Sequence, residues 1–412
     1  MERLLKSVLN VREFKLHVDD DHVDRLSHRV TVIILVCFAF IISTKQFVGV
    51  PISCWCPAQF TPSHREYADT VCWVSNTYYL LTDEEIPKER LSTEKKKQVV
   101  CYYQWAPLIL IFQAILSFIP CQIWRFLNQR SGVNLCTVMD AAHVCSEASY
   151  LEVREKAIRY IVNHMDRYLL SQREFRTGCM IRIKHFIAKV CCLVGGRLYG
   201  NYLITAYLSV KILYIVVAVV QLMLMEVFLG IEHCWYGAYV VDKLIKGQKW
   251  EQSERFPRVT LCEFELRQQA RVHYHIVQCA LTINLFNEKI FVFVWFWFVF
   301  LVIITFINVL KWLFRSLYWP GQVQYVRRRL RAFDVAQREP SVLAKFTENY
   351  LRRDGMFILR LISMNMGEVV AGEALCGLWN NYNPDKRLMV EKHGRRHMER
   401  MRINGAKKVE LV

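Results

Sequence analysis

The sequence predicts an all-α membrane protein with four transmembrane helices, a helical cytoplasmic domain and two disulfide-linked extracellular loops. Of its 412 residues, 53% are hydrophobic and 22% are charged. The apolar residues are concentrated in a few blocks separated by charged stretches, whereas a water-soluble protein would spread them at helix or strand periods. Lys and Arg flank these blocks unevenly, and several cysteines lie in the two loops whose charge is balanced.

Four apolar blocks are each long enough to cross a bilayer. Each has roughly 20 residues, which at about 1.5 Å per residue covers the ~30 Å hydrocarbon core. A polar stretch precedes the first block and no small-residue cleavage pattern follows it, so we expect this block to remain as a span. The predicted spans are residues 30–49, 105–124, 208–230 and 290–310.

The third span contains two charged residues, Lys211 and Glu226, which lie near its opposite ends. A charge at the bilayer centre costs roughly 2.5–3.5 kcal/mol on insertion scales, but a long side chain near an end can reach the interface. We therefore expect both side chains to extend towards water.

The distribution of Lys and Arg orients the spans. Residues 125–207 are rich in both, and residues 311–412 include Arg327, Arg328, Arg329 and Arg331. Acidic residues offset the basic ones in residues 50–104 and 231–289. Because basic loops stay in the cytoplasm, we predict that the two balanced loops are extracellular. Residues 1–29, 125–207 and 311–412 are then cytoplasmic.

Two of the predicted cytoplasmic stretches have the pattern of folded helices. Residues 355–379 are apolar enough to pack, and residues 150–170 place apolar side chains at helical spacing. The apolar positions of the second stretch are Leu151, Ala157, Ile158, Ile161, Met165 and Leu169.

The chain has 15 cysteines, and those in the predicted outer loops can form disulfides because the extracellular space is oxidising. Bridges between the two loops would make a rigid cap, while pairing within each loop is the alternative. Spacing alone does not decide between them. The cysteines concerned are Cys54, Cys56, Cys72 and Cys101 for the first loop and Cys234, Cys262 and Cys279 for the second.

No pattern typical of an enzyme, a metal site or a cofactor site is present. We find no phosphate-binding or dinucleotide glycine pattern, no Ser/His/Asp arrangement and no zinc spacing of His and Cys. The net charge of +17 is high enough for nucleic-acid binding, but the basic clusters lack interleaved aromatic residues and a domain motif. We predict no catalytic residue, metal, cofactor or nucleic-acid partner.

Several long motifs follow one another along the chain. They are residues 17–26, residues 51–80, the tetrapeptide Tyr102, Tyr103, Gln104 and Trp105 at the start of the second span, residues 256–267 and residues 277–298. In this order they resemble the innexins, the gap-junction channel proteins of invertebrates: the start of the chain, the first outer loop, the family signature, and the second outer loop with the entry into the fourth span. The resemblance weakens after Arg315.

This resemblance implies a disulfide pairing and an assembly. The implied bonds join Cys54 to Cys279 and Cys72 to Cys262, while Cys56 is additional and leaves open which of Cys54 and Cys56 pairs. The resemblance further implies homo- or hetero-oligomeric rings of about eight subunits. Two rings dock between adjacent cells, and ions and small solutes diffuse through the pore. The protein would then lie in the plasma membrane at gap junctions, and a ring could also act alone as a hemichannel.

The N-terminal segment and the first span are expected to line the pore. Polar groups in a span usually face protein or water, and packing against neighbouring helices is the alternative. Lys45 in the pore would disfavour cations, and the acidic residues near the inner mouth would oppose this effect. The candidates are Thr31, Cys37, Ser43, Lys45 and Gln46 in the span and Asp19, Asp20, Asp21 and Asp24 before it.

Further expected partners are lipids and a PDZ domain. The clusters at residues 327–331 and 395–402 fit anionic lipid, and Glu410-Leu411-Val412 fits carboxylate capture by a PDZ domain. Three rival functions remain: a non-docking channel like the pannexins, a four-span adhesion protein of the claudin type, and a thiol oxidoreductase using Cys54 and Cys56. The outer loops contain no N-x-Ser/Thr glycosylation site, which favours docking.

Overall fold

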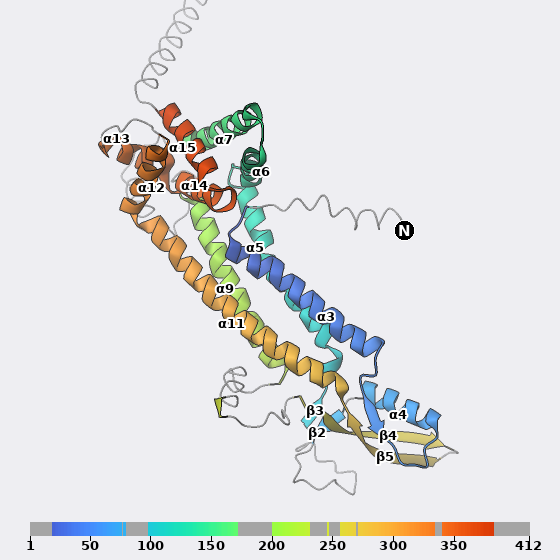
Figure 1. Ribbon diagram of the computed structural model, residues 1–412. Helices are drawn as coiled ribbons and strands as arrows, with labels where there is room; N and C mark the ends of the chain where they lie inside the picture. Colours follow the sequence, from blue (N-terminus) through green and yellow to red (C-terminus); the bar gives the residue numbers. More distant parts are fainter. Residues whose placement is uncertain are drawn as a thin grey trace, which may run out of the picture. The chain divides into compact units, whose positions relative to one another are not determined.

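The computed structural model describes residues 19–75, 77–79, 98–171, 200–230, 245–246, 256–268, 271–333 and 340–382 (Figure 1). The chain divides into two compact units, each built from separate stretches of sequence. The unit that we call the helical unit comprises residues 1–25, 121–212 and 307–412. The unit that we call the disulfide unit comprises residues 26–120 and 213–306.

Four helices among the described residues are long and apolar enough to cross a membrane. This confirms the prediction of a four-span, mainly helical membrane protein. Most of the helices continue beyond the predicted apolar spans, because a helix does not have to end where its apolar stretch ends. They are α2, η2 and α3 as one run (His22–Arg25, Leu26–Val30 and Thr31–Phe47), α5 (Ala106–Gln129), α9 (Tyr202–Phe228) and α11 (Thr282–Leu317).

Shorter helices build the core of the helical unit. Helix α6 packs on α7, and α15 packs on both α7 and α14. Gly367 separates α14 from α15 with φ +93°, a conformation that favours glycine. The elements are α6 (Leu135–Glu147), α7 (Leu151–Ser171), α12 (Trp319–Ala332), α13 (Pro340–Lys345), η5 (Phe346–Leu351), α14 (Arg352–Met366) and α15 (Glu368–Tyr382).

Helix α7 confirms the helix predicted over residues 150–170. Its buried face contains Ala157, Ile161, Met165 and Leu169, which recur at helical spacing as predicted. Leu151, at the first position of the helix, is exposed instead. The stretch of residues 355–379 also packs as predicted, since α14 and α15 bury most of its apolar side chains.

The disulfide unit contains a β-sheet that the sequence analysis did not predict. Its five strands run in the order β1-β5-β4-β2-β3, and every pair is antiparallel. Alternate residues of β4 are buried, among them Thr260, Cys262 and Phe264, which is the period of two expected of a strand. The elements are β1 (Ser53–Trp55), α4 (Pro62–Val74), β2 (Thr77–Tyr79), β3 (Gln98–Val100), η3 (Tyr102–Gln104), β4 (Val259–Gln268) and β5 (Arg271–Ala280).

Candidate docking sheet and pore-lining helix

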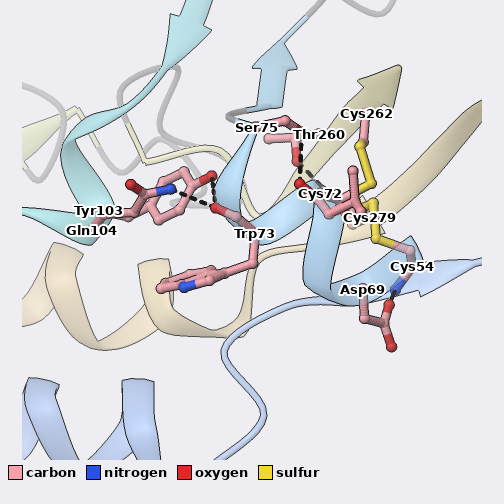
Figure 2. Close-up of a disulfide and its surroundings, with 11 residues drawn as sticks. Cys54, Asp69, Cys72, Trp73, Ser75, Tyr103, Gln104, Thr260, Cys262 and Cys279 are labelled. Atoms are coloured by element: carbon pink, nitrogen blue, oxygen red, sulfur yellow. Dashed lines mark hydrogen bonds between the residues drawn. A yellow bond between two sulfur atoms is a disulfide. The ribbon is translucent and has the colours of Figure 1, made fainter. Parts of the chain in front are cut away.

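Two disulfides join the loop that follows the first long helix to the loop that precedes the last one (Figure 2). Cys54 bonds Cys279 and Cys72 bonds Cys262, across sequence separations of 225 and 190 residues. This is the pairing that the resemblance implied, and it rules out pairing within each loop for these four cysteines. Cys56 is a buried free thiol.

Strand geometry explains why these cysteines meet. Cys54 and Cys279 are directly opposed partners on β1 and β5, and side chains of opposed residues point to the same face of a sheet. Cys262 on β4 lies opposite Val277 and is buried too. Helix α4 supplies Cys72, and the Asp69 carboxylate of the same helix accepts a hydrogen bond of 2.7 Å from the Cys54 backbone N–H. The four cysteines therefore form one buried layer between the sheet and α4.

The start of α4 is held by its own sequence. The Thr61 hydroxyl accepts a hydrogen bond from the His64 backbone N–H, and Pro62 occupies the first turn, where its missing N–H leaves no gap in the helical ladder. This cap determines where the helix begins. It therefore also determines that Cys72, ten residues after Pro62, faces the sheet. Cys72 is fully buried there.

The sheet also ties the end of α3 to the start of α11. Ser53 pairs with Ala280, and the Thr282 hydroxyl donates to the backbone carbonyls of Val50 at 2.7 Å and Pro51 at 3.1 Å. These contacts fix two candidate membrane helices to each other at one end. Movement of the sheet would therefore be transmitted to both helices.

The signature tetrapeptide makes a second junction, where β3 leads into α5. The Gln104 side-chain amide and the Tyr103 hydroxyl both donate to the Trp73 carbonyl at the end of α4 (Figure 2). The Tyr103 carbonyl accepts a 2.7 Å hydrogen bond from the Gln46 side chain on α3. Burial raises the pKa of Tyr103 to about 12, so its hydroxyl remains a donor at physiological pH. The tetrapeptide thus joins α3, α4 and α5.

The β4–β5 hairpin presents an exposed face away from the disulfides. Its ladder runs from Val259 opposite Ala280 to Gln268 opposite Arg271. The exposed side chains include Val272, Tyr274 and Ile276. Aromatic and aliphatic side chains on a rigid hairpin are typical of a surface that binds another protein.

Helix α3 has a buried face and an exposed face. Leu35, Ala39 and Ile42 are buried, and an exposed stripe that includes Ile33 and Phe40 recurs at helical spacing. Of the five predicted pore-lining residues in this helix, only Cys37 is fully on the exposed side. Ser43, Lys45 and Gln46 are half-buried, and Thr31 is buried.

Comparison with known proteins identifies the family to which the chain belongs. The innexin family model matches residues 20–382. The chain is 37% identical to innexin unc-9 of Caenorhabditis elegans over 91% of this chain and 95% of that protein. It is 32% identical to innexin-19 of Caenorhabditis briggsae over 99% and 95%, and 33% identical to innexin-11 of C. elegans over 89% and 79%.

The chain belongs to the innexin family. Innexins are gap-junction channel subunits that assemble into multimeric channels, so this innexin is a multi-pass protein of the plasma membrane. Its function follows from the family together with the four apolar helices and the two disulfides.

The structure of this innexin speaks against the thiol oxidoreductase alternative. That activity needs Cys54 and Cys56 as a reactive pair, but Cys54 is bonded to Cys279. Burial and the neighbouring Asp69 carboxylate raise the pKa of the Cys56 thiol. A thiol with a raised pKa is a poor nucleophile because less of it is thiolate.

Thr31, one of the predicted pore-lining residues, packs against a neighbouring helix, as the alternative interpretation of these polar residues expected. Its hydroxyl accepts a 3.0 Å hydrogen bond from the Trp297 indole N–H on α11 and donates to the Leu26 carbonyl. Gln46 is likewise engaged, through the Tyr103 carbonyl. These two polar groups hold helices together.

The four acidic candidates are also buried, which the sequence analysis did not foresee. Each is at most 4% exposed. Asp20 accepts a 3.0 Å hydrogen bond from Arg25, and Asp21 accepts hydrogen bonds from the Asn308 and Trp312 side chains. Asp19 accepts a hydrogen bond from the Cys136 thiol, and Asp24 pairs with Lys211. Within one subunit these carboxylates face protein, and their predicted effect on ion selectivity stays a prediction.

The prediction that Lys211 and Glu226 of the third span extend towards water is wrong, because both side chains are buried. The Lys211 side chain is 0% exposed, with its ammonium nitrogen 2.7 Å from Asp24 Oδ1 and 3.7 Å from Asp21 Oδ2. The Tyr207 hydroxyl donates to the other Asp24 oxygen at 2.6 Å. Glu226 is buried too. Two carboxylates stabilise the Lys211 ammonium inside the protein, so it does not have to reach the interface.

Some predicted features lie outside the described residues. They are the start of the chain before Asp19, the outer-loop cysteine Cys234, the basic cluster of residues 395–402 and the C-terminal Glu410, Leu411 and Val412.

Proposed function

We propose that this innexin forms a ring of about eight subunits, alone or with other innexins, and that the ring docks onto a second ring in an adjacent cell. The observation that carries the proposal is the sheet locked by two disulfides between loops far apart in sequence. A surface held in one conformation before binding loses little conformational entropy when it binds. The exposed face of the β4–β5 hairpin is the docking surface in this proposal.

The cysteines support the proposed sidedness, in which the disulfide unit is extracellular and the helical unit is cytoplasmic. Both disulfides lie in the disulfide unit. In the helical unit, Cys136, Cys145 and Cys376 are free thiols. Disulfides persist outside the cell, whereas cytosolic thiols stay reduced. The arginines of residues 327–331 agree with this orientation.

Within the ring, we assign the pore lining to α3. Cys37 lies on its exposed face, and Lys45 is half-buried near its end. A ring of Lys45 side chains at the outer end of the pore would favour anions, since like charges repel cations there. Diffusion through a pore needs no catalytic group, so we propose no enzymatic activity.

Recording from paired cells that express only this innexin tests docking. We expect a junctional current between the cells. A current confined to single cells would contradict docking and indicate a non-docking, pannexin-like channel. Membrane expression without any current would indicate an adhesion protein without a pore.

Reversal potentials under a salt gradient test the pore assignment. We expect Lys45→Glu to shift the permeability from anions towards cations. Lys289→Glu, at an exposed position near the start of α11, makes the same charge change on another helix and serves as the control. An unchanged ion preference in the Lys45 variant would contradict the pore assignment.

A further inference from the structure

A basic cavity in the helical unit has no role in the channel described above. It has a volume of about 550 Å³, which lies within the range of about 300–1,000 Å³ that is typical of small-molecule sites. Four arginines from three helices line it: Arg315 of α11, Arg328 and Arg329 of α12, and Arg360 of α14. Residues distant in sequence thus converge on one space.

The cavity has a surplus of positive charge. Among the described residues, its only acidic lining residue is Glu368, which pairs with Arg329. Arg315, Arg328 and Arg360 are then left without a carboxylate in the lining. Burial and the nearby charge of Arg315 lower the pKa of Arg360 to about 10. A bound anion would offset this charge.

An aromatic ring fixes two of the guanidinium groups. The Arg329 and Arg360 guanidinium carbons lie 5.2 Å and 5.6 Å from the centre of the Tyr325 ring. Cation–π contacts of this kind restrict the guanidinium groups to a few orientations. Arginines held in place can bind phosphate oxygens in bidentate fashion, which mobile surface arginines do less well.

The cavity lies at the depth of lipid headgroups. At about 1.5 Å per residue, Arg315 is roughly 8 Å along α11 beyond Leu310, where the predicted apolar span ends. The headgroup layer of a bilayer extends about 5–8 Å past the hydrocarbon core on each side. Phe314, Leu317 and Tyr318, beside Arg315, are exposed apolar or aromatic residues of the kind that anchor helices at this interface.

We propose that this cavity binds a ligand with two or more phosphate groups, and that the ligand is the headgroup of a polyphosphorylated membrane lipid. The surplus arginines match several phosphate charges, which a lipid with a single carboxylate and phosphodiester does not supply. The apolar residues beside Arg315 provide a surface for the acyl chains.

The test is binding to the full-length protein in an uncharged detergent, measured by thermophoresis. The probes are dioctanoyl phosphatidylinositol bisphosphate, soluble inositol trisphosphate and dioctanoyl phosphatidylserine. We expect the phosphoinositide to bind most tightly. Equal affinity for inositol trisphosphate would overturn the lipid source and assign the site to a soluble polyphosphate. Equal affinity for phosphatidylserine would overturn the polyphosphate site.

Two double variants separate the cavity from general charge. Arg328→Gln with Arg360→Gln removes two lining arginines and is expected to weaken phosphoinositide binding about tenfold or more. Arg327→Gln with Arg331→Gln removes the same charge from exposed positions of α12 outside the cavity lining, and is expected to leave binding nearly unchanged. Equal losses in the two pairs would overturn the proposal. Arg328→Gln alone, at an exposed position, provides the same comparison with Arg327→Gln if the Arg360 change lowers the yield of folded protein.

Discussion

Covalent bonds between distant residues hold the disulfide unit together, whereas the helical unit depends on apolar packing around a few buried charges. In the disulfide unit, Cys54–Cys279 and Cys72–Cys262 cross the sheet. In the helical unit, Cys136, Cys145 and Cys376 are free thiols, and burial with the Asp19 carboxylate raises the pKa of Cys136 to about 12. The comparison teaches that the two units have different weak points: the cross-links in the disulfide unit and the buried charges in the helical unit.

The largest expected effect is at the buried ion pair of the helical unit. Lys211→Met leaves the Asp21 and Asp24 carboxylates buried without their cation, which is expected to lower the free energy of unfolding by about 3–5 kcal/mol. Thermal unfolding of the detergent-solubilised protein measures it. Lys311→Met, at an exposed position of α11, is the control and should change stability by less than about 0.5 kcal/mol.

A compensating substitution sharpens this prediction. Asp24→Asn in the Lys211→Met background removes one of the uncompensated charges and should recover part of the loss. Wild-type stability for Lys211→Met alone would show that the buried charges are not the weak point of the helical unit.

The next effect concerns the disulfide unit. Cys72→Ala with Cys262→Ala removes one cross-link and is expected to cost about 2–4 kcal/mol, because the unfolded chain regains freedom. Reducing agent should destabilise the wild type and affect this variant less. In the helical unit, Cys136→Ala with Cys145→Ala should leave the response to reducing agent unchanged. If Cys136→Ala with Cys145→Ala altered the effect of reducing agent on stability, the proposed difference in cross-linking between the two units would be wrong.

Packing between α7 and α15 tests the apolar side of the comparison. A Cβ at Gly377 would lie 2.5 Å from the Val162 Cγ2 atom, so Gly377→Ala is expected to destabilise by about 1–3 kcal/mol. Adding Val162→Ala makes room and should recover stability relative to the single variant. Chemical denaturation of Gly377→Ala, Val162→Ala and the double variant measures the three free energies of unfolding. A loss in the double variant equal to the sum of the two single losses would contradict direct contact.

The smallest effect is expected at a partly exposed ion pair. Arg154 donates two hydrogen bonds to the Glu373 carboxylate, and both side chains are partly open to water. Arg154→Gln should therefore cost about 1 kcal/mol or less. The difference from wild type should shrink at high salt, where exposed charges are screened. A loss of stability as large as that of Lys211→Met would show that solvent exposure does not explain the difference in strength between the Arg154–Glu373 and Lys211–Asp24 ion pairs.

Several features of the site were readable from local sequence. The apolar blocks predicted the four long helices, and the helical spacing of Ile161, Met165 and Leu169 predicted the buried face of α7. The β4–β5 hairpin escaped prediction because its buried side chains include Thr260 and Cys262, which are not strongly apolar. The burial of Asp21 and Asp24 was not predicted either, because their partners are far away in sequence. Lys211 on α9 is 187 residues from Asp24, and Asn308 on α11 is 287 residues from Asp21.

The sequence by itself determined the membrane-spanning character, the family and which cysteines are available for pairing, because hydropathy and ordered motifs are local properties of the chain. Only the tertiary structure decided that Lys211 is neutralised inside the protein and that Thr31 holds helices together. It also decided that Arg315, Arg328 and Arg360 share one cavity. The reason is physical: the energy of a charged or polar group depends on what surrounds it, and folding brings those surroundings from distant parts of the chain.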